Sequence, residues 1–146
     1  MTGLLLALLL APMAAHASDP APSAQMSASD VSRIQDLIDD QLGAFQRDDA
    51  AAAWKHVAPS LRAKFGSPDT FLRMVREGYP PVHRMQDRRF EELTVLPTGE
   101  LGQWLEITGA NGERVRALYL MERQADGTWR TSGCLLFRNE PAEPSV

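Results

Sequence analysis

The sequence predicts an α+β domain in which N-terminal helices pack on one face of a curved, four-stranded antiparallel meander. Apolar residues recur at helical spacing in the first part of the chain, whereas downstream of Met85 they alternate with polar residues. Turn signals divide this alternating part into consecutive hairpins. Helices and strands therefore occupy separate parts of the chain, which favours two layers, one helical and one formed by the sheet.

The first helix is predicted over residues 29–46. Ser27 or Ser29 can cap its N-terminus, and Asp30 is favourable in its first turn. Charged residues between the apolar positions indicate a solvated opposite face. The apolar stripe comprises Val31, Ile34, Leu37, Ile38, Leu42 and Phe45.

Three shorter helices are predicted between residues 50 and 78. The first runs through "AAAAWKHV" and is ended by Pro59, because proline interrupts helices. The second, "SLRAKF", stops at Gly66, and the third, "TFLRMVREG", stops at Gly78. The following "YPPVHRM" is predicted to be an extended crossing, since its two prolines lack backbone donors.

Four strands follow, joined by three turns. "GANGE" and "ADGT" each carry a two-residue hairpin signal, and "LPTGEL" turns the first pair of strands. Each turn joins neighbours along the chain, so the sheet is a meander. The predicted strands are Phe90–Leu96, Leu101–Thr108, Arg114–Gln124 and Thr128–Arg138.

The helices can cover one face of this sheet, and the other face keeps several apolar residues. Exposed apolar patches often mark an association surface, so a homodimer through the sheet face is predicted. The alternative is a few isolated surface apolar residues, which are common. The candidate dimer residues are Trp104, Leu118, Leu120, Cys134 and Leu136.

The N-terminus carries the pattern of a secretory signal peptide. An apolar run at residues 4–15 precedes Ala15-His16-Ala17, so cleavage between Ala17 and Ser18 is predicted. No Lys or Arg precedes the run, which leaves an uncleaved anchor or a misplaced start codon as alternatives. The expected protein is periplasmic or secreted, without a transmembrane anchor after cleavage. The predicted divisions are a signal peptide (1–17), a flexible linker (18–28), the domain (29–138) and a disordered tail (139–146).

Charge and cysteine content restrict the chemistry. A net charge of −4 makes general binding to nucleic-acid phosphates a poor prediction. One cysteine cannot form an internal disulfide, and three histidines with one cysteine at wide spacing predict no metal site. No cofactor is predicted.

Three segments carry a family resemblance: "LIDDQLGAFQRDDAAAAWKHVAP", "PDTFLRMVREGYPPV" and "DGTWRTSGCLLF". In this order they resemble the exported bacterial proteins grouped as DUF4864, over about residues 30–138. That group resembles the NTF2-like superfamily, which implies a cone: helices plug the concave side of a bent sheet, and a pocket often opens between them. The resemblance transfers no activity and no catalytic residues. The wider superfamily includes enzymes and pure binding modules, so the fold leaves function open.

The candidate site residues lie where such a pocket would open. Glu92 or His83 could act as an acid or base beside Tyr79 or Tyr119. The arginines at 84, 88 and 89 could hold an anion, or they could belong to a solvated connection. The candidate pocket lining is Trp54, Phe71, Tyr79, Gln103, Tyr119 and Trp129.

Cys134 is predicted to pack as a small apolar residue, with a redox or intermolecular role as the alternative. Two functions follow. The favoured one is a non-enzymatic module that binds a small apolar ligand or an unknown partner protein. The alternative is a small pocket enzyme of isomerase or hydrolase type with an acid or base in the cone.

Overall fold

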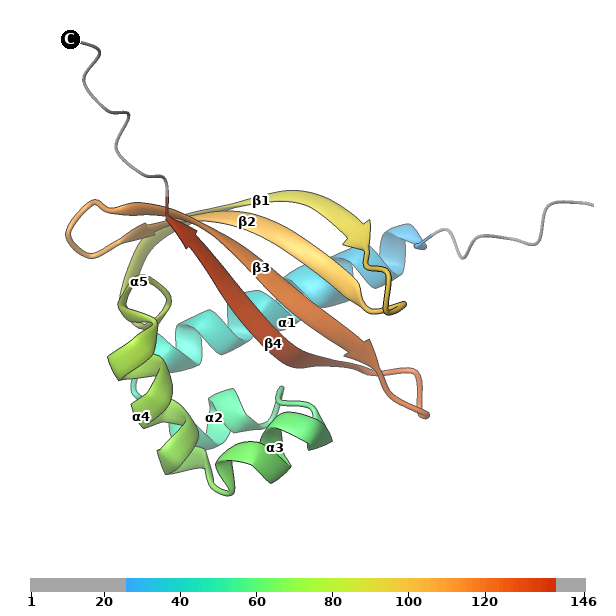
Figure 1. The fold of residues 1–146 in the computed structure, drawn as a ribbon, viewed down its shortest axis with the longest axis horizontal. Coiled ribbons are helices and arrows are strands. Elements are labelled where there is room, and N and C mark those ends of the chain that lie inside the picture. The colour runs from blue at the N-terminus through green and yellow to red at the C-terminus, as the bar shows by residue number, and fades with distance from the viewer. Residues whose placement is uncertain (1–25, 139–146) are drawn as a thin grey trace, which may run out of the picture.

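A computed structural model describes residues 26–138, and the predicted signal peptide, most of the linker and the tail lie outside the described residues. Helices pack on one side of a single four-stranded antiparallel sheet of order β1-β2-β3-β4, which confirms the α+β meander (Figure 1). The helices are α1 (Ala28–Gln46), α2 (Ala50–Trp54), α3 (Pro59–Phe65), α4 (Pro68–Gly78) and α5 (Pro80–His83). The strands are β1 (Met85–Val95), β2 (Leu101–Gly109), β3 (Arg114–Arg123) and β4 (Trp129–Arg138).

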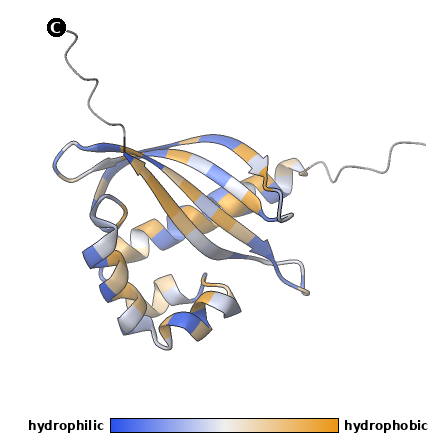
Figure 2. Ribbon diagram, viewed as in Figure 1, coloured by the Kyte–Doolittle hydropathy of each residue, from blue (hydrophilic) through white to orange (hydrophobic). Residues whose placement is uncertain are grey.

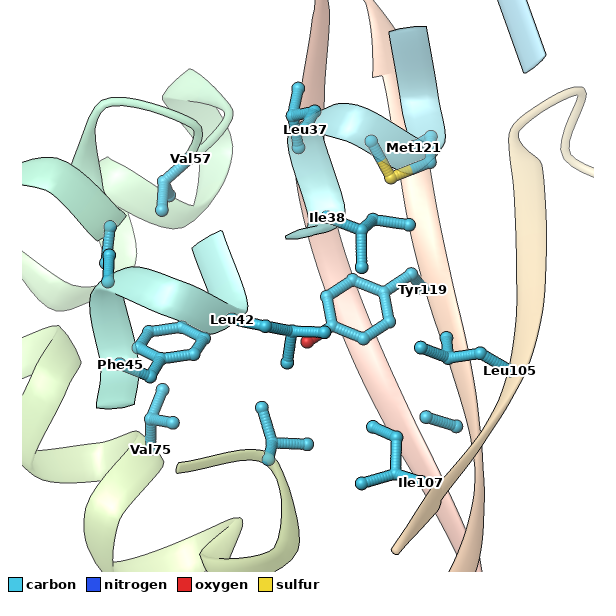
Figure 3. Close-up of a cluster of buried hydrophobic side chains, with 14 of the residues drawn as sticks. Leu37, Ile38, Leu42, Phe45, Val57, Val75, Leu105, Ile107, Tyr119 and Met121 are labelled. Carbon is cyan, nitrogen blue, oxygen red and sulfur yellow. The ribbon is translucent and has the colours of Figure 1, made fainter. Parts of the chain in front are cut away.

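Helix α1 forms because its cap and its apolar stripe agree. The Ser27 side chain accepts a hydrogen bond from the backbone N–H of Asp30, which satisfies one free donor of the first turn. In Figure 2 hydrophobic and hydrophilic residues alternate along α1, as expected for a helix covered on one side. Its Ile38 and Leu42 are fully buried against the sheet, where Tyr119 lies between them and β2 (Figure 3).

The segment "YPPVHRM" is not the extended crossing that the sequence predicted. Pro80 and Pro81 occupy the first positions of the one-turn helix α5. The N–H groups that proline lacks would have no partner there in any helix, so the two prolines cost no hydrogen bond. The turn brings Val82 and His83 into the interior, where both are buried.

The three hairpins have the same turn. In each, the backbone N–H of a glycine at positive φ donates to the carbonyl three residues earlier, and a second backbone bond joins the two residues that flank the loop. In "GANGE" the first bond runs from Gly112 N to Gly109 O at 2.9 Å, and the second from Gly109 N to Glu113 O at 2.7 Å. This is the three-residue loop with a left-handed glycine, rather than the two-residue loop predicted for "GANGE" and "ADGT". The other turn glycines are Gly99 and Gly127.

A bulge in β1 places Glu92 outside the interior. The pairing of β1 with β2 shifts between Phe90 and Leu93, so the alternation of side chains across the sheet is interrupted there. The prediction of Glu92 on the concave face was therefore wrong. Its side chain is 61% exposed, and its carboxylate accepts a hydrogen bond from Arg116 at 3.0 Å on the face away from the helices.

A second bulge reverses the faces of β4. Leu120 pairs with Gly133, but Met121 pairs with Thr131, so Ser132 is the extra residue. Upstream of it Trp129 and Thr131 face the helices, and downstream Cys134 and Leu136 do. The prediction placed Cys134 and Leu136 on the outer face, and this was wrong because it continued the strict period of two through Ser132.

Candidate ligand cavity

A cavity of about 390 Å³ lies between the helices and the C-terminal half of the sheet. Helices α1, α3 and α4 line it on one side and strands β3 and β4 on the other. Lys64 and Leu135 are solvent-exposed members of the lining, so the cavity meets solvent between α3 and β4. Most of the lining is apolar, with side chains that include Phe45, Leu61, Phe65, Phe71, Met74, Val75 and Val82.

Most polar groups of the lining are already bonded to the protein. The Gln41 amide donates to the carbonyl of Ala53 at 3.1 Å, and its oxygen accepts from the Thr131 hydroxyl at 3.2 Å. The Tyr79 hydroxyl donates to the carbonyl of Cys134 at 3.1 Å, which connects α4 to the edge strand β4. These bonds fix the positions of the lining elements and leave few groups free to bind a polar ligand.

The Tyr119 hydroxyl is different. Tyr119 lies in the middle of β3, is 1% exposed and lines the cavity. Its hydroxyl oxygen points toward α1 in Figure 3 and has no hydrogen-bond partner among residues 26–138. Burial raises the pKa of Tyr119 well above its usual range, because the phenolate would lose its hydration. The group therefore stays protonated and can donate a hydrogen bond.

Cys134 also lines the cavity, and its thiol is not activated. Burial raises the pKa of Cys134 to about 12, and no cation acts on it in the opposite direction. A thiol of this kind is neutral at pH 7 and is a weak nucleophile. It contributes a small, mostly apolar surface to the site.

The structure brings three of the predicted pocket residues together and separates the other three from the cavity. Phe71, Tyr79 and Tyr119 line it. Trp54 packs on Phe71 from the outside, with ring centroids 5.8 Å apart. Gln103 is fully buried beside the β1 bulge and donates to the Glu91 carbonyl at 2.9 Å.

Trp129 lies at the other end of the sheet. Its indole N–H donates to Asp30 at 3.2 Å, so it joins β4 to the start of α1 instead of lining the cavity. A hydrogen bond from the Ser27 hydroxyl, followed by this one from Trp129, lowers the pKa of Asp30. The role of Trp129 is therefore to hold the N-terminus of α1.

His83, the second acid–base candidate, belongs to a cluster outside the cavity. Its Nε2 lies 2.7 Å from Asp48 Oδ1, and the same carboxylate accepts from Arg84 at 2.6 Å and from Arg76 at 3.3 Å. Asp48 has φ +52°, a left-handed conformation at the end of α1. These bonds, led by the one from His83, hold the pKa of Asp48 far below its usual range. The cluster joins α1, α4 and α5.

The arginines between the helices and the sheet also have carboxylate partners. Arg88 makes two bonds of 2.6 Å to Asp39, and Arg89 lies 3.6 Å from Glu91. Arg84 is bound to Asp48. Each guanidinium thus has an internal counter-ion, which weakens the prediction that they hold an external anion.

Most of the cavity lining was not predicted from the sequence, and Gln41 and Met74 are two examples. Gln41 is a polar residue within the apolar stripe of α1, and a buried amide at such a position is the signal that could have indicated a polar feature inside. Met74 lies in α4 close to the apolar residues Phe71 and Val75, and nothing in this spacing distinguishes a cavity wall from a filled core.

The outer face of the sheet carries an apolar cluster that we define as Trp104, Leu118, Leu120, Leu135 and Phe137. The Trp104 and Phe137 rings lie 5.3 Å apart, and the Arg116 guanidinium lies 4.2 Å from the Trp104 ring centroid. Leu135 and Phe137 are 49% and 47% exposed. Trp104, Leu118 and Leu120 lie on the face that the sequence predicted.

Neither a metal site nor a membrane span is found in the described part of the chain. No group of three His, Cys, Asp or Glu side chains between residues 26 and 138 could hold a metal ion. Within the same range no helix is long and apolar enough to cross a membrane.

Fold and cavity define a class: a small α+β domain with helices on one face of an antiparallel meander and an apolar cavity between the layers. The chain belongs to the DUF4864 family, a domain of unknown function, whose model matches residues 27–144. No curated protein and no solved structure matches the chain. The NTF2-like cone stays a prediction.

Proposed function

We propose that this protein is a non-enzymatic module that binds a small, mostly apolar molecule in the cavity between α3, α4 and β4. The observation that carries the proposal is the cavity itself, about 390 Å³ with a mainly apolar lining that reaches the surface. Binding sites for small molecules are typically concave and apolar with a few polar groups, and this one matches that description.

The positions of the acid–base candidates favour binding over catalysis. Glu92 is exposed on the opposite face of the sheet, and His83 is held by Asp48 outside the cavity. The two tyrosines that line the cavity therefore have neither residue within hydrogen-bonding distance. Cys134 is a neutral thiol, so it does not supply a nucleophile. A pocket enzyme with one of the predicted acid–base residues would need Glu92 or His83 inside the cavity, and neither lines it.

The proposal is tested with N-phenyl-1-naphthylamine, an uncharged dye whose fluorescence rises in apolar sites. Met74 lines the cavity and is only half-buried, so Met74→Trp should block the cavity with little strain on the core. Phe137→Ser is the matched control, because it removes an exposed aromatic ring from the outer face. The expected result is saturable dye binding that Met74→Trp abolishes and Phe137→Ser retains. Binding lost in the control and kept in Met74→Trp would contradict the proposal.

A second candidate function is self-association through the outer apolar cluster. Two large side chains there, Leu135 and Phe137, are about half exposed, whereas Leu118 is buried and Trp104 and Leu120 are partly buried. A second copy of the chain could cover them, and the mixed charges around the cluster, Glu92 and Arg116 among them, could pair across a two-fold axis. A homodimer of this kind is the form of partner binding that these residues favour.

Sedimentation velocity tests the dimer. Phe137→Asp should convert a dimer to a monomer, because it buries an unpaired carboxylate in the interface. Val95→Asp is the matched control, since Val95 is 66% exposed and lies outside the cluster. A wild-type protein that sediments as a monomer at high concentration would contradict this second proposal.

We also propose export, on the sequence pattern of residues 1–17 alone. Cleavage after Ala17 leaves a mature protein that begins at Ser18. Mass spectrometry of the protein from the periplasmic fraction of its host should find this N-terminus. A full-length chain that retains Met1 would contradict cleavage.

A further inference from the structure

The unpartnered Tyr119 hydroxyl carries an inference about the chemistry of the ligand. A buried hydroxyl without a hydrogen-bond partner costs free energy, because it has given up water without compensation. In native proteins such groups are few, and each requires an explanation. Among residues 26–138 this hydroxyl is the one buried side-chain N or O atom without a partner. It belongs to a residue that lines the cavity.

The hydroxyl proton of Tyr119 is free to be donated to a ligand group that accepts. The neighbouring amide and hydroxyl of the lining are bonded to each other, Gln41 to Thr131 at 3.2 Å. The Tyr79 hydroxyl is bonded to the Cys134 carbonyl. A ligand that places an oxygen acceptor next to Tyr119 would satisfy the free donor without breaking any of these bonds.

The charge of the lining indicates that this acceptor is neutral. The cation in the lining is Lys64, which lies at the exposed rim on α3, whereas Tyr119 lies in the central strand β3. Burying a carboxylate without a paired cation is strongly unfavourable, but a carbonyl needs only the one hydrogen bond that Tyr119 can supply.

We propose that the cavity selects an uncharged, mostly apolar molecule with a carbonyl oxygen, such as a ketone, ester or amide, that accepts a hydrogen bond from the Tyr119 hydroxyl. This inference rests on the proposed function, since it requires that the cavity binds small molecules. An apolar cavity of about 150 Å³ can hold benzene, so a cavity of this size admits a substituted ring.

The test compares three probes of similar size: acetophenone, ethylbenzene and benzoate. Acetophenone and ethylbenzene differ by a carbonyl in place of a methylene, so the change in their affinity ratio when the Tyr119 hydroxyl is removed isolates the hydrogen bond. A net neutral hydrogen bond corresponds to a change of roughly twofold to tenfold in this ratio. In NMR titrations the affinity of acetophenone relative to ethylbenzene should be higher in the wild-type protein than in Tyr119→Phe by this factor, and benzoate should bind the wild-type protein more weakly than both.

Tyr119→Phe keeps the ring and removes the donor. Because the hydroxyl has no partner to lose, the variant should unfold at the same temperature or higher, which is checked by thermal unfolding. The substitution should weaken acetophenone binding and leave ethylbenzene binding nearly unchanged. An affinity ratio of the two probes that does not fall in Tyr119→Phe, or benzoate binding as tightly as acetophenone, would overturn this inference while leaving the binding function intact. Failure of all three probes to bind would overturn both.

Discussion

The rate at which Cys134 is alkylated measures how strongly burial in the cavity wall shields its thiol from water. Burial raises the pKa of Cys134 to about 12, whereas an exposed thiol has a pKa of about 8.5. Alkylating reagents react with the thiolate. At pH 8.5 an exposed thiol is about half ionised, but a thiol of pKa 12 is ionised in roughly one molecule in three thousand. The folded protein should therefore be alkylated about a thousandfold more slowly than the unfolded chain.

The assay follows iodoacetamide labelling by intact mass, in buffer and in concentrated urea. The chain has a single cysteine, so each added mass reports this thiol, and Cys134→Ser gives the blank. In urea the rate should level off above about pH 9, and in buffer it should keep rising, about tenfold per pH unit, beyond pH 10. A folded protein whose rate levels off near pH 9 and stays within tenfold of the urea rate would refute the reasoning.

The same raised pKa has a consequence for stability. The folded state holds the thiol proton more tightly than the unfolded state does, so unfolding releases a proton at alkaline pH. The contribution of the neutral thiol is complete below about pH 9 and is lost as the pH rises toward about 12. The free energy of unfolding of the wild type, measured with denaturant, should fall over this pH range more steeply than that of Cys134→Ser.

Other predictions concern the frame around the cavity. Asp48→Asn should lower the free energy of unfolding at neutral pH and should make that free energy fall less as the pH drops below about 4. The reason is that the lowered pKa of Asp48 contributes stability that is present above its ordinary pKa and lost in acid. Urea titrations at several pH values measure this, and Asp36→Asn, on the exposed face of α1, should behave as wild type. Gly102→Ala should destabilise by about 1–3 kcal/mol in urea, since its new Cβ would lie 2.6 Å from Leu118 Cδ1 in a packed position. Gly78→Ala, where the Cβ meets no atom within 4 Å, should instead stabilise α4 by about 0.5–1 kcal/mol; an equal effect of both variants would contradict the packing argument.

The sequence was sufficient for the layers of this fold because local signals agree with the tertiary structure. Glycines such as Gly112 and Gly127 end the hairpins where the alternation breaks, and Ser27 caps a helix whose apolar stripe faces the sheet. The two bulges were not predictable in the same way. A bulge leaves no sign in the types of residue that form a strand. The faces on which Glu92 and Cys134 lie therefore depend on the pairing between strands, which strict alternation along one strand does not predict.

The candidate site was predictable to the extent that it depends on large aromatic residues. Phe71, Tyr79 and Tyr119 line the cavity, as the positions of their elements predicted. In the sequence, Gln103 and Trp129 looked equivalent to the residues that line the cavity, but each is held away from it by a hydrogen bond to a distant segment. Whether an interior is hollow or filled depends on the fit of side chains from several elements, and no spacing rule encodes that fit.

The extra residue in β4 couples two properties that would otherwise be separate. Because the bulge absorbs Ser132, it keeps Cys134 and Leu136 on the face of the helices while Leu135 and Phe137 stay on the opposite surface. Pairing Ser132 in the regular ladder would exchange the two sets, turning Phe137 inward and Cys134 outward, whereas deleting the serine would remove the bulge and leave both sets in place. One local change of pairing would therefore alter the cavity wall and the outer apolar cluster of this protein together.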